Sequence, residues 1–373
     1  MKATMTERAA KAAGGFPDRL LPLLRCFRDG AELVIHREER AGSAGLIDGS
    51  FRCTSCSQEY AVEGGVVRMM LDTLTPENAH ELALKDREYQ EMPDEFVPAT
   101  CGWRSEYGDR IEIPPHLEAL EPLDDLRLLE FGCGDGRLTL LAAQLGAEVL
   151  AVDISKEGLR KLADRLSSGQ APTTFQVKPR KTVQEFRARV GLVQADASHF
   201  AVASRSFHRV LAATPLDSRD ERMRMYRMAA ESLVDGGRYV GGVEHDDLCR
   251  RLLGLPVARR YTPGGIFIEH LSIPQMRREA APYFSRLQVR PIRAFPPFIR
   301  KLPVKLAAPL SLGFNSLPGL RHFGTILLMC AERPIRHPAE GLRRPGSALA
   351  KTFYRKYKRW RAEEPFWDHS EEV

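Results

Sequence analysis

A glycine-rich turn between two short apolar runs constrains the fold of this chain more than any other stretch. Residues 126–131 have the composition of a buried strand, a G-C-G-D-G turn follows at 132–136, and residues 138–145 are helix formers. A second apolar run, residues 147–152, ends on Asp153. This order of strand, turn, helix and strand is a βαβ unit, which predicts an α/β protein with a doubly wound sheet.

The turn and Asp153 together predict a site for a nucleoside. Glycines at 132, 134 and 136 let the backbone turn sharply and approach a ligand closely, which a β-carbon would block. An acid at the tip of the second strand is placed to accept hydrogen bonds from both ribose hydroxyls. The spacing departs from the G-x-G-x-x-G pattern of dinucleotide enzymes. We therefore expect a nucleoside cofactor other than NAD.

Four stretches, in the right order, resemble the motifs of class I S-adenosylmethionine-dependent methyltransferases. They are E-F-G-C-G-D-G from Glu130, the acid Asp153, L-V-Q-A-D-A at 192–197 and L-V-D-G-G-R-Y-V at 233–240. The resemblance implies a Rossmann-like, seven-stranded sheet and S-adenosyl-L-methionine as cofactor. It also implies that the turn cradles the amino-acid end of the cofactor, that Asp153 holds the ribose and that residues near 196 meet the adenine. The implied cofactor-binding residues are Glu130, Gly132, Cys133, Gly134, Gly136, Asp153, Ile154, Asp196 and Ala197.

The same reading divides the chain into five parts. They are a flexible lead (1–19), a zinc-ribbon-like module (20–72), a helical connector or lid (73–123), the methyltransferase domain (124–335) and a basic amphipathic tail (336–373). Within the domain, strands are predicted at 206–213 and 238–243, helices at 157–166 and 220–233, and a closing antiparallel pair at 285–294 and 323–331. The basic insert at 167–187 is expected to be a solvated loop.

The N-terminal module is predicted from two short knuckles, C-F-R-D at 26–29 and C-T-S-C at 53–56. Paired knuckles bring four ligands into tetrahedral reach of zinc, and zinc binding folds modules that are too small for a core. The pattern is similar to the zinc ribbon of activator subunits of tRNA methyltransferases, except that Asp29 replaces one thiol. Cys26, Asp29, Cys53 and Cys56 are therefore either zinc ligands or the remnant of a ribbon that has lost its metal.

The positive charge of the chain is concentrated near its C-terminus. Of a net charge of +6, eight basic residues and no acid lie between Arg343 and Arg361, so the rest of the chain is slightly acidic. This distribution argues against a nucleic-acid footprint over the whole fold. Residues 349–360 fit a basic amphipathic helix that either lies on an anionic membrane surface or docks its aromatic side chains on its own domain. The seven cysteines form no disulfide framework, and no window reaches membrane-spanning length, so we expect a cytoplasmic protein.

The acceptor of the methyl group is predicted only by class. The apolar, proline-broken stretch 295–322 either walls a hydrophobic acceptor pocket or covers a sheet edge. This stretch and the nearly neutral body favour a small or lipid-like acceptor. The alternatives are an RNA methyltransferase, in which the ribbon and tail hold nucleic acid, and a non-catalytic binding module. His245 and His270 are candidate bases, if the acceptor must lose a proton, or otherwise structural histidines.

Overall fold

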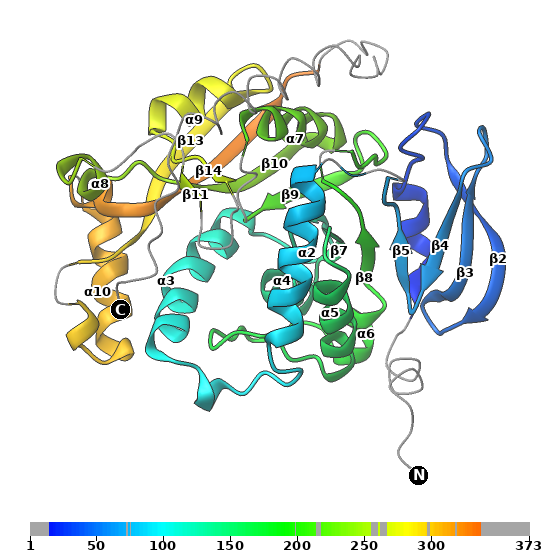
Figure 1. The fold of residues 1–373 in the computed structure, drawn as a ribbon, viewed down its shortest axis with the longest axis horizontal. Coiled ribbons are helices and arrows are strands. Elements are labelled where there is room, and N and C mark those ends of the chain that lie inside the picture. Colours follow the sequence, from blue (N-terminus) through cyan, green and yellow to red (C-terminus); the bar gives the residue numbers. More distant parts are fainter. Residues whose placement is uncertain are drawn as a thin grey trace. The chain divides into compact units, whose positions relative to one another are not determined.

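One large sheet runs through the described part of the chain (Figure 1). The computed structural model describes residues 15–336, apart from 72–73, 75, 198, 214–217, 255–259, 262–266, 297–298 and 318. The sheet has twelve strands in the order β1-β3-β4-β5-β8-β7-β6-β9-β10-β14-β13, and β2 pairs with β3. Its strands are β1 (Phe16–Pro17), β2 (Leu33–Ala41), β3 (Gly45–Cys53), β4 (Glu59–Glu63), β5 (Val66–Arg68), β6 (Arg127–Phe131), β7 (Glu148–Asp153), β8 (Val190–Gln194), β9 (Phe207–Ala212), β10 (Leu233–Glu244), β13 (Phe284–Ala294) and β14 (Gly324–Pro334).

Helices cover both faces of this sheet. The α-helices are α2 (Pro76–Glu91), α3 (Trp103–Leu120), α4 (Arg137–Gln144), α5 (Lys156–Ser168), α6 (Val183–Arg187), α7 (Arg219–Ser232), α8 (Leu248–Leu252), α9 (Ile273–Ala280) and α10 (Val304–Ser316). Short 3-10 helices are η1 (Asp18–Leu23), η2 (Pro98–Thr100), η3 (Ile299–Lys301) and η4 (Leu320–Phe323), and β11 (Arg260–Tyr261) pairs with β12 (Phe267–Ile268).

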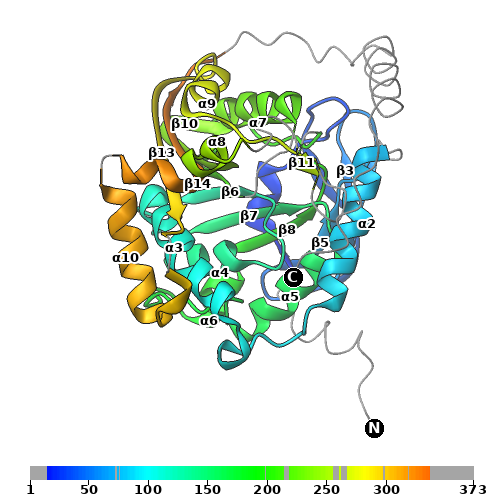
Figure 2. The same cartoon turned by 60° about the vertical axis from the view of Figure 1, so that its left-hand side comes forward.

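Side chains alternate along β6, so the two faces of the sheet have separate cores. Leu129 and Phe131 belong to a core that also contains side chains of η1, α7 and α9. Leu128 belongs to a second core, which contains side chains of α3, α4 and α5. This alternation is the period of two that a strand buried on both faces requires. Figure 2 shows α3, α4 and α5 below and to the left of the central strands β6, β7 and β8 in that view.

The middle of the sheet is parallel and its far edge is antiparallel. Strands β8, β7, β6, β9 and β10 pair in parallel, which brings the carboxyl ends of β6 and β7 to one edge. Strand β14 is antiparallel to both β10 and β13. The strands and helices predicted in this part of the sequence lie within a few residues of the observed ones. The basic insert is partly helical, because Thr182 and Glu185 form a capping box that begins α6.

The N-terminal module differs from the prediction in two ways. The expected lead of residues 1–19 ends earlier, because Phe16 is fully buried and pairs with Leu46. The module was also expected to be separate from a seven-stranded sheet. Instead, β5 pairs in parallel with β8, so the module continues the main sheet; Val67 lies opposite Val193 in this register. The ordered module and the α/β body therefore share one sheet and one core.

The chain divides into a compact unit of Met1–Ile335 and a second unit of Arg336–Val373. The predicted amphipathic helix at 349–360 lies outside the described residues. Among the helices that the structure describes, none combines the length and the apolar character needed to cross a bilayer.

Candidate functional site

The glycine-rich turn joins the end of β6 to the start of α4. Gly132, Gly134 and Gly136 have φ values of 67°, 53° and 92°, in the left-handed region that disfavours other residues. Gly136 is the N-cap of α4, and a β-carbon there would strike the side chain of Leu162. The glycine pattern read from the sequence therefore has a conformational cause at all three positions.

Asp153 lies at the carboxyl end of β7 and holds the glycine-rich turn through hydrogen bonds from backbone N–H groups. Its Oδ2 accepts a hydrogen bond from the backbone N–H of Gly134 at 2.7 Å, and its Oδ1 accepts one from that of Ser155 at 2.8 Å. The side chain is buried. Burial raises the pKa of Asp153, although the two N–H donors oppose this rise. The carboxylate is thus fixed in place, and each oxygen keeps a lone pair for a further donor.

Glu130 is placed differently from the other predicted cofactor residues. Its side chain is buried and accepts a hydrogen bond from Thr139 Oγ at 2.6 Å, within α4. Burial raises the pKa of Glu130 to about 7. This hydrogen bond ties the end of β6 to the first turns of α4, so the geometry favours a supporting role beneath the turn over direct ligand contact.

The adenine side of the predicted site lies after β8. Asp196 Oδ2 receives a hydrogen bond from Asn78 Nδ2 at 2.6 Å and lies 2.8 Å from His199 Nδ1. The carbonyl of Ile154 accepts a hydrogen bond from Gln194 Nε2 at 3.1 Å. Both groups follow neighbouring parallel strands, β7 and β8, and therefore lie at the same edge of the sheet. Cys133 is buried within the turn, and Ala197 is partly buried.

Helix α2 covers this edge, within the part of the chain that was expected to form a helical connector or lid. Besides Asn78, Asp86 accepts hydrogen bonds from Ser155 Oγ at 2.6 Å and from the N–H of Glu157 at 3.2 Å. The hydroxyl of Tyr89 lies against Gly134, where it would strike a β-carbon. The sequence of α2 is highly charged and carries little helical periodicity of apolar residues, so it gave no signal for these contacts. Figure 1 shows α2 running beside α5.

Acidic side chains lie around Glu81 of α2. Burial, together with the charges of Glu221, Asp153 and Asp196, raises the pKa of Glu81 to about 7, against the effect of Lys85. Burial also raises the pKa of Tyr89, and Asp153 and Asp135 add to the rise. Burial is the main cause in both residues, because it favours the neutral form of each acid. The carboxylates of Asp153 and Asp196 add to the rise at Glu81, so this edge of the sheet carries acidic groups that fit the positively charged S-adenosylmethionine.

A second polar cluster joins α3 to the start of α4. Arg137 donates to Asp109 Oδ1 at 3.2 Å and to Glu112 Oε1 at 3.0 Å, and Arg293 lies 3.9 Å from Glu112. Burial opposes ionisation of Glu112, but the two arginines hold its pKa below the usual range. Glu244, the last residue of β10, interacts with Arg293 and Glu112, and burial raises its pKa. These acids lie far apart along the chain, and the fold brings them together around Arg137 and Arg293.

The two candidate histidines come from adjacent segments. His245 forms a parallel bridge with Leu271, the residue that follows His270, so the backbone brings the two together. His245 Nδ1 lies 2.6 Å from the carbonyl oxygen of Gly324. A carbonyl can only accept, so Nδ1 carries the proton and Nε2 is left with a lone pair. Burial lowers the pKa of His245, which keeps the ring neutral.

The four predicted metal ligands lie together at one end of the N-terminal module. Cys26, Asp29, Cys53 and Cys56 each offer one ligand atom, and these atoms all lie within 4.8 Å of one another. Cys26 and Cys56 place their sulfur atoms 3.6 Å apart. The N–H groups of Ser55 and Cys56 each donate to Cys53 Sγ at 3.4 Å. Cys53 Sγ therefore accepts two backbone hydrogen bonds, and it also lies 3.4 Å from Asp29 Oδ1. A hydrogen bond from the N–H of Ala31 holds the pKa of Asp29 below its usual range.

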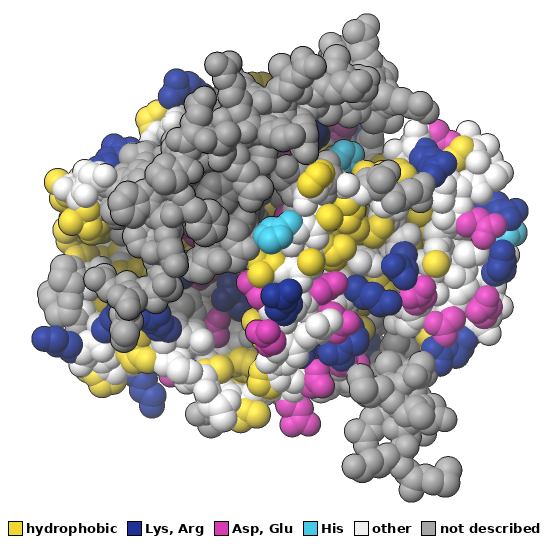
Figure 3. All heavy atoms as spheres, viewed as in Figure 1, with side chains coloured by type: hydrophobic (Ala, Val, Ile, Leu, Met, Phe, Trp, Pro, Cys, Tyr) yellow, Lys and Arg dark blue, Asp and Glu magenta, His cyan; other side chains and the backbone are white. Residues whose placement is uncertain are grey.

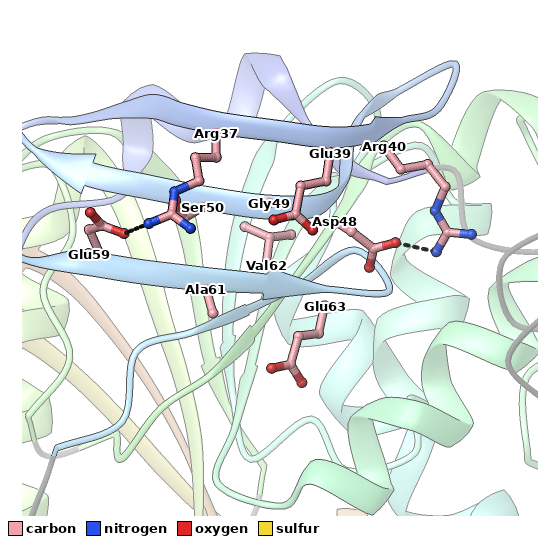
Figure 4. A pocket seen from close by; sticks show the side chains of 10 residues that line it. All are labelled: Arg37, Glu39, Arg40, Asp48, Gly49, Ser50, Glu59, Ala61, Val62 and Glu63. Atoms are coloured by element: carbon pink, nitrogen blue, oxygen red, sulfur yellow. Dashed lines mark hydrogen bonds and ion pairs between the residues drawn. The ribbon is translucent and has the colours of Figure 1, made fainter.

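The module also has a surface hollow of about 610 Å³ on strands β2, β3 and β4 (Figure 4). Arg40 pairs with Asp48, and Arg37 lies 3.5 Å from Glu59, which also pairs with Arg52. Glu39 and Glu63 line the hollow as well, so its acids outnumber its bases. A groove with paired arginines and an excess of acids does not attract a phosphate backbone.

Comparison with known families agrees with the site at the sheet edge. Residues 129–241 match a family model described as "Methyltransferase domain". The matched segment extends from β6 into β10 and includes the glycine turn, Asp153 and Asp196. None of the curated proteins compared matches the chain. The match supports an S-adenosylmethionine-dependent methyltransferase.

Solved structures with low similarity include three methyltransferases. An S-adenosylmethionine-dependent methyltransferase from Mesorhizobium loti is 16% identical with a TM-score of 0.41, covering 62% of this chain and 100% of its own. The CcbJ methyltransferase from Streptomyces caelestis is 16% identical with a TM-score of 0.41, covering 66% and 96%. The glycopeptide N-methyltransferase MtfA in complex with S-adenosylmethionine is 21% identical with a TM-score of 0.39, covering 61% and 94%. Similarity at this level carries no information about the acceptor of this chain.

Proposed function

We propose that the methyltransferase domain at residues 129–241 uses S-adenosyl-L-methionine to methylate a small or lipid-like acceptor. The main support for methyl transfer is the geometry of the glycine turn. Asp153 holds the backbone of Gly134 by a hydrogen bond at the carboxyl ends of β6 and β7. The family match covers the same residues. The acceptor class rests on the distribution of charge and apolar surface.

The residues around the turn would hold the cofactor in a defined way. The backbone of Gly132 to Gly134 would bind the amino-acid end of the cofactor. The Asp153 carboxylate would accept hydrogen bonds from the ribose hydroxyls, and Asp196 with Ala197 would border the adenine. Tyr89 of α2, whose hydroxyl lies against Gly134, would close over the bound molecule. When bound, the cofactor supplies a methyl group on a positively charged sulfur, already activated for transfer.

The remaining work of the protein is to position the acceptor and, where needed, to take its proton. Alignment of an acceptor atom with the methyl group supplies much of the rate in such a reaction. His245 is suited to take a proton, because its ring is neutral and its Nε2 carries a lone pair. Glu112 and Glu244 would bring negative charge to a cationic or amine-bearing acceptor.

Two alternatives read from the sequence receive no support from a specific observation. An RNA methyltransferase would need a basic surface on the N-terminal module, but the hollow there has paired arginines and more acids than bases. A non-catalytic module is not favoured, because the match to the methyltransferase family model includes the glycine turn and Asp153. Our proposal therefore keeps the small or lipid-like acceptor.

We also propose that the N-terminal module binds one zinc ion through Cys26, Asp29, Cys53 and Cys56. The support is the convergence of three thiols and one carboxylate within 4.8 Å. Three sulfur ligands with one oxygen ligand suit a closed, tetrahedral structural site. Zinc there would be structural, because the cluster lies in the module and not at the carboxyl ends of β6 and β7.

We expect the protein to be cytoplasmic. We also expect the tail of residues 336–373 to contact either an anionic membrane surface or the domain itself. It is compatible with a lipid-like acceptor, because such a molecule would be reached at the surface of a bilayer.

The acceptor class can be tested with methyl-labelled S-adenosylmethionine and a cell extract. After incubation with the full-length protein, the extract is separated into lipid, water-soluble small-molecule, RNA and protein fractions. We expect label in the lipid or small-molecule fraction, and markedly less label with the Asp153→Ala variant. Label confined to RNA or protein would contradict the proposed acceptor class, and no label in any fraction from a protein that binds the cofactor would favour the non-catalytic alternative.

A further inference from the structure

Helix α10 has apolar side chains on two opposite sides. Its inner side is buried and consists of Val304, Ala307, Ala308 and Ser311. On its outer side, Leu306 is 62% exposed and Leu310 is 40% exposed, and Leu317, just beyond the helix, is 51% exposed. A surface helix of a globular protein normally turns polar residues to solvent. The outer side of α10 therefore has the character of a surface that meets an apolar partner.

Specific contacts hold the inner side of α10 in place. Trp103 Nε1 donates to the carbonyl of Leu302 at 2.9 Å, just before the helix begins. Tyr107, which is fully buried, donates to the carbonyl of Ala294 at 3.1 Å and also contacts the hydroxyl of Ser311. Tyr107 and its neighbours thus form a small core between α3 and α10. Because this core fixes the rotation of α10, the outer leucines cannot turn inward.

The exposed apolar surface continues onto α8. Leu252 is 73% exposed and Leu253 is 72% exposed. The short helix η4 contacts both α8 and α10, which places the two helices in one neighbourhood. We refer to the surface formed by Leu252, Leu253, Leu306, Leu310 and Leu317 as the α8–α10 face.

The charge around the α8–α10 face is positive. No acid occurs between Glu279 and Glu332 in the sequence. Four cations flank the leucines and form no ion pair with any other described residue: Arg300, Lys301, Lys305 and Arg321. In contrast, Arg290 of β13 pairs with Glu118 at 3.0 Å. In Figure 3, hydrophobic and basic side chains are visible along the left side, where Figure 1 places α8 and α10, whereas basic and acidic side chains mix on the right.

We infer that the α8–α10 face binds the surface of a lipid bilayer that contains anionic lipids. Exposed leucines next to unpaired lysines and arginines are the combination that inserts at the boundary between head groups and acyl chains. A second copy of the chain fits less well, because a symmetric dimer would bring the same cations together across the interface. The surface is independent of which acceptor is methylated.

The full-length protein can be tested by flotation with vesicles. We expect binding to vesicles of phosphatidylcholine mixed with phosphatidylglycerol, and little binding to phosphatidylcholine alone. Leu306→Asp combined with Leu310→Asp should weaken binding by at least about tenfold, because two apolar side chains that would insert into the bilayer are lost. Lys301→Gln combined with Lys305→Gln should weaken it by about fivefold for each charge. The matched control is Val34→Asp combined with Ile35→Asp, on exposed positions of β2, which should bind like the wild type.

Several outcomes would overturn the inference. Unchanged vesicle binding by the Leu306/Leu310 variant, with loss of binding on deletion of residues 337–373, would assign the membrane contact to the tail. The wild type could also fail to bind vesicles. If it then forms a dimer that the Leu306/Leu310 variant dissociates, the leucines serve self-association. If the variant instead lowers the melting temperature, they serve packing. Binding of S-adenosylhomocysteine, measured by calorimetry on the same samples, reports separately on the proposed function.

Discussion

Asp153 holds the glycine turn through backbone hydrogen bonds and still has a lone pair on each oxygen for a ligand. Asp153→Ala should weaken binding of S-adenosylhomocysteine by about 1–3 kcal/mol, because the ribose hydroxyls would lose a charged acceptor. Titration calorimetry measures this change. Asp124→Ala is the control, since that acid is 44% exposed and pairs with Lys181 instead. Equal affinities for the wild type and the Asp153 variant would show that this carboxylate does not hold the cofactor.

Glu130 should make the stability of the protein depend on pH. Burial raises its pKa from 4.5 to about 7, so between these values the folded protein keeps a proton that the unfolded chain releases. Its contribution to stability is therefore complete below pH 4.5 and is lost as the pH rises through about 7. The Glu130→Gln substitution removes this loss of stability with rising pH, because glutamine does not ionise. Its side-chain oxygen can still accept the hydrogen bond from Thr139.

Relative to the wild type, the free energy of unfolding of the Glu130→Gln variant should increase by up to about 3 kcal/mol over that interval. Urea unfolding at a series of pH values measures the difference. Glu38→Gln, at an exposed position of β2, serves as the control and should follow the wild type. A constant difference between Glu130→Gln and wild type across the interval would argue that Glu130 is ionised throughout.

Among the larger elements, the N-terminal module offers the clearest test, because it shares the main sheet. If the four ligands bind metal, emission spectroscopy should find about one zinc per chain. Cys53→Ser should release the metal and raise amide hydrogen exchange in β3 and β4, and also in β5 and β8, because β5 pairs with β8. Cys249→Ser is the control, since Cys249 is an exposed, free cysteine in α8. A protein without metal whose module is equally protected from exchange would identify a ribbon that folds without zinc.

The βαβ elements could be predicted because each rests on local chemistry. Three glycines at left-handed φ values, the strand that ends on Asp153 and the alternating apolar pattern of β6 are all visible in the sequence. The proximity of the four zinc ligand candidates followed from their spacing in two knuckles. Such features depend on neighbours a few residues apart.

The remaining features depend on contacts between distant segments, which the sequence does not show. Asn78 meets Asp196 across 118 positions, and Tyr107 meets Ser311 across 204. The pairing of β5 with β8 was likewise not predictable, because Val66–Arg68 reads as an ordinary end of a small module. For the same reason, the outer leucines of α10 could be identified as exposed only after its inner side was seen to pack on α3.

On the scale of the whole molecule, the described structure places the glycine turn with Asp153, a cluster of candidate metal ligands and an apolar, basic face on one continuous body. Helix α3 connects two of them, since Asp109 and Glu112 bind Arg137 after the glycine turn and Tyr107 packs on α10. Helix α3 thus contacts both α10, part of the face that would dock on a bilayer, and the residues that follow the glycine turn. An acceptor at the bilayer surface would lie on the same compact unit of the protein as the cofactor.

The central claim is that this chain binds S-adenosylmethionine at the turn after β6, and one calorimetric titration tests it directly. Full-length protein should bind S-adenosylmethionine and S-adenosylhomocysteine with dissociation constants on the order of micromolar, and NAD should give no binding heat. Binding of NAD, or no binding of either S-adenosyl compound by folded protein, would contradict the account.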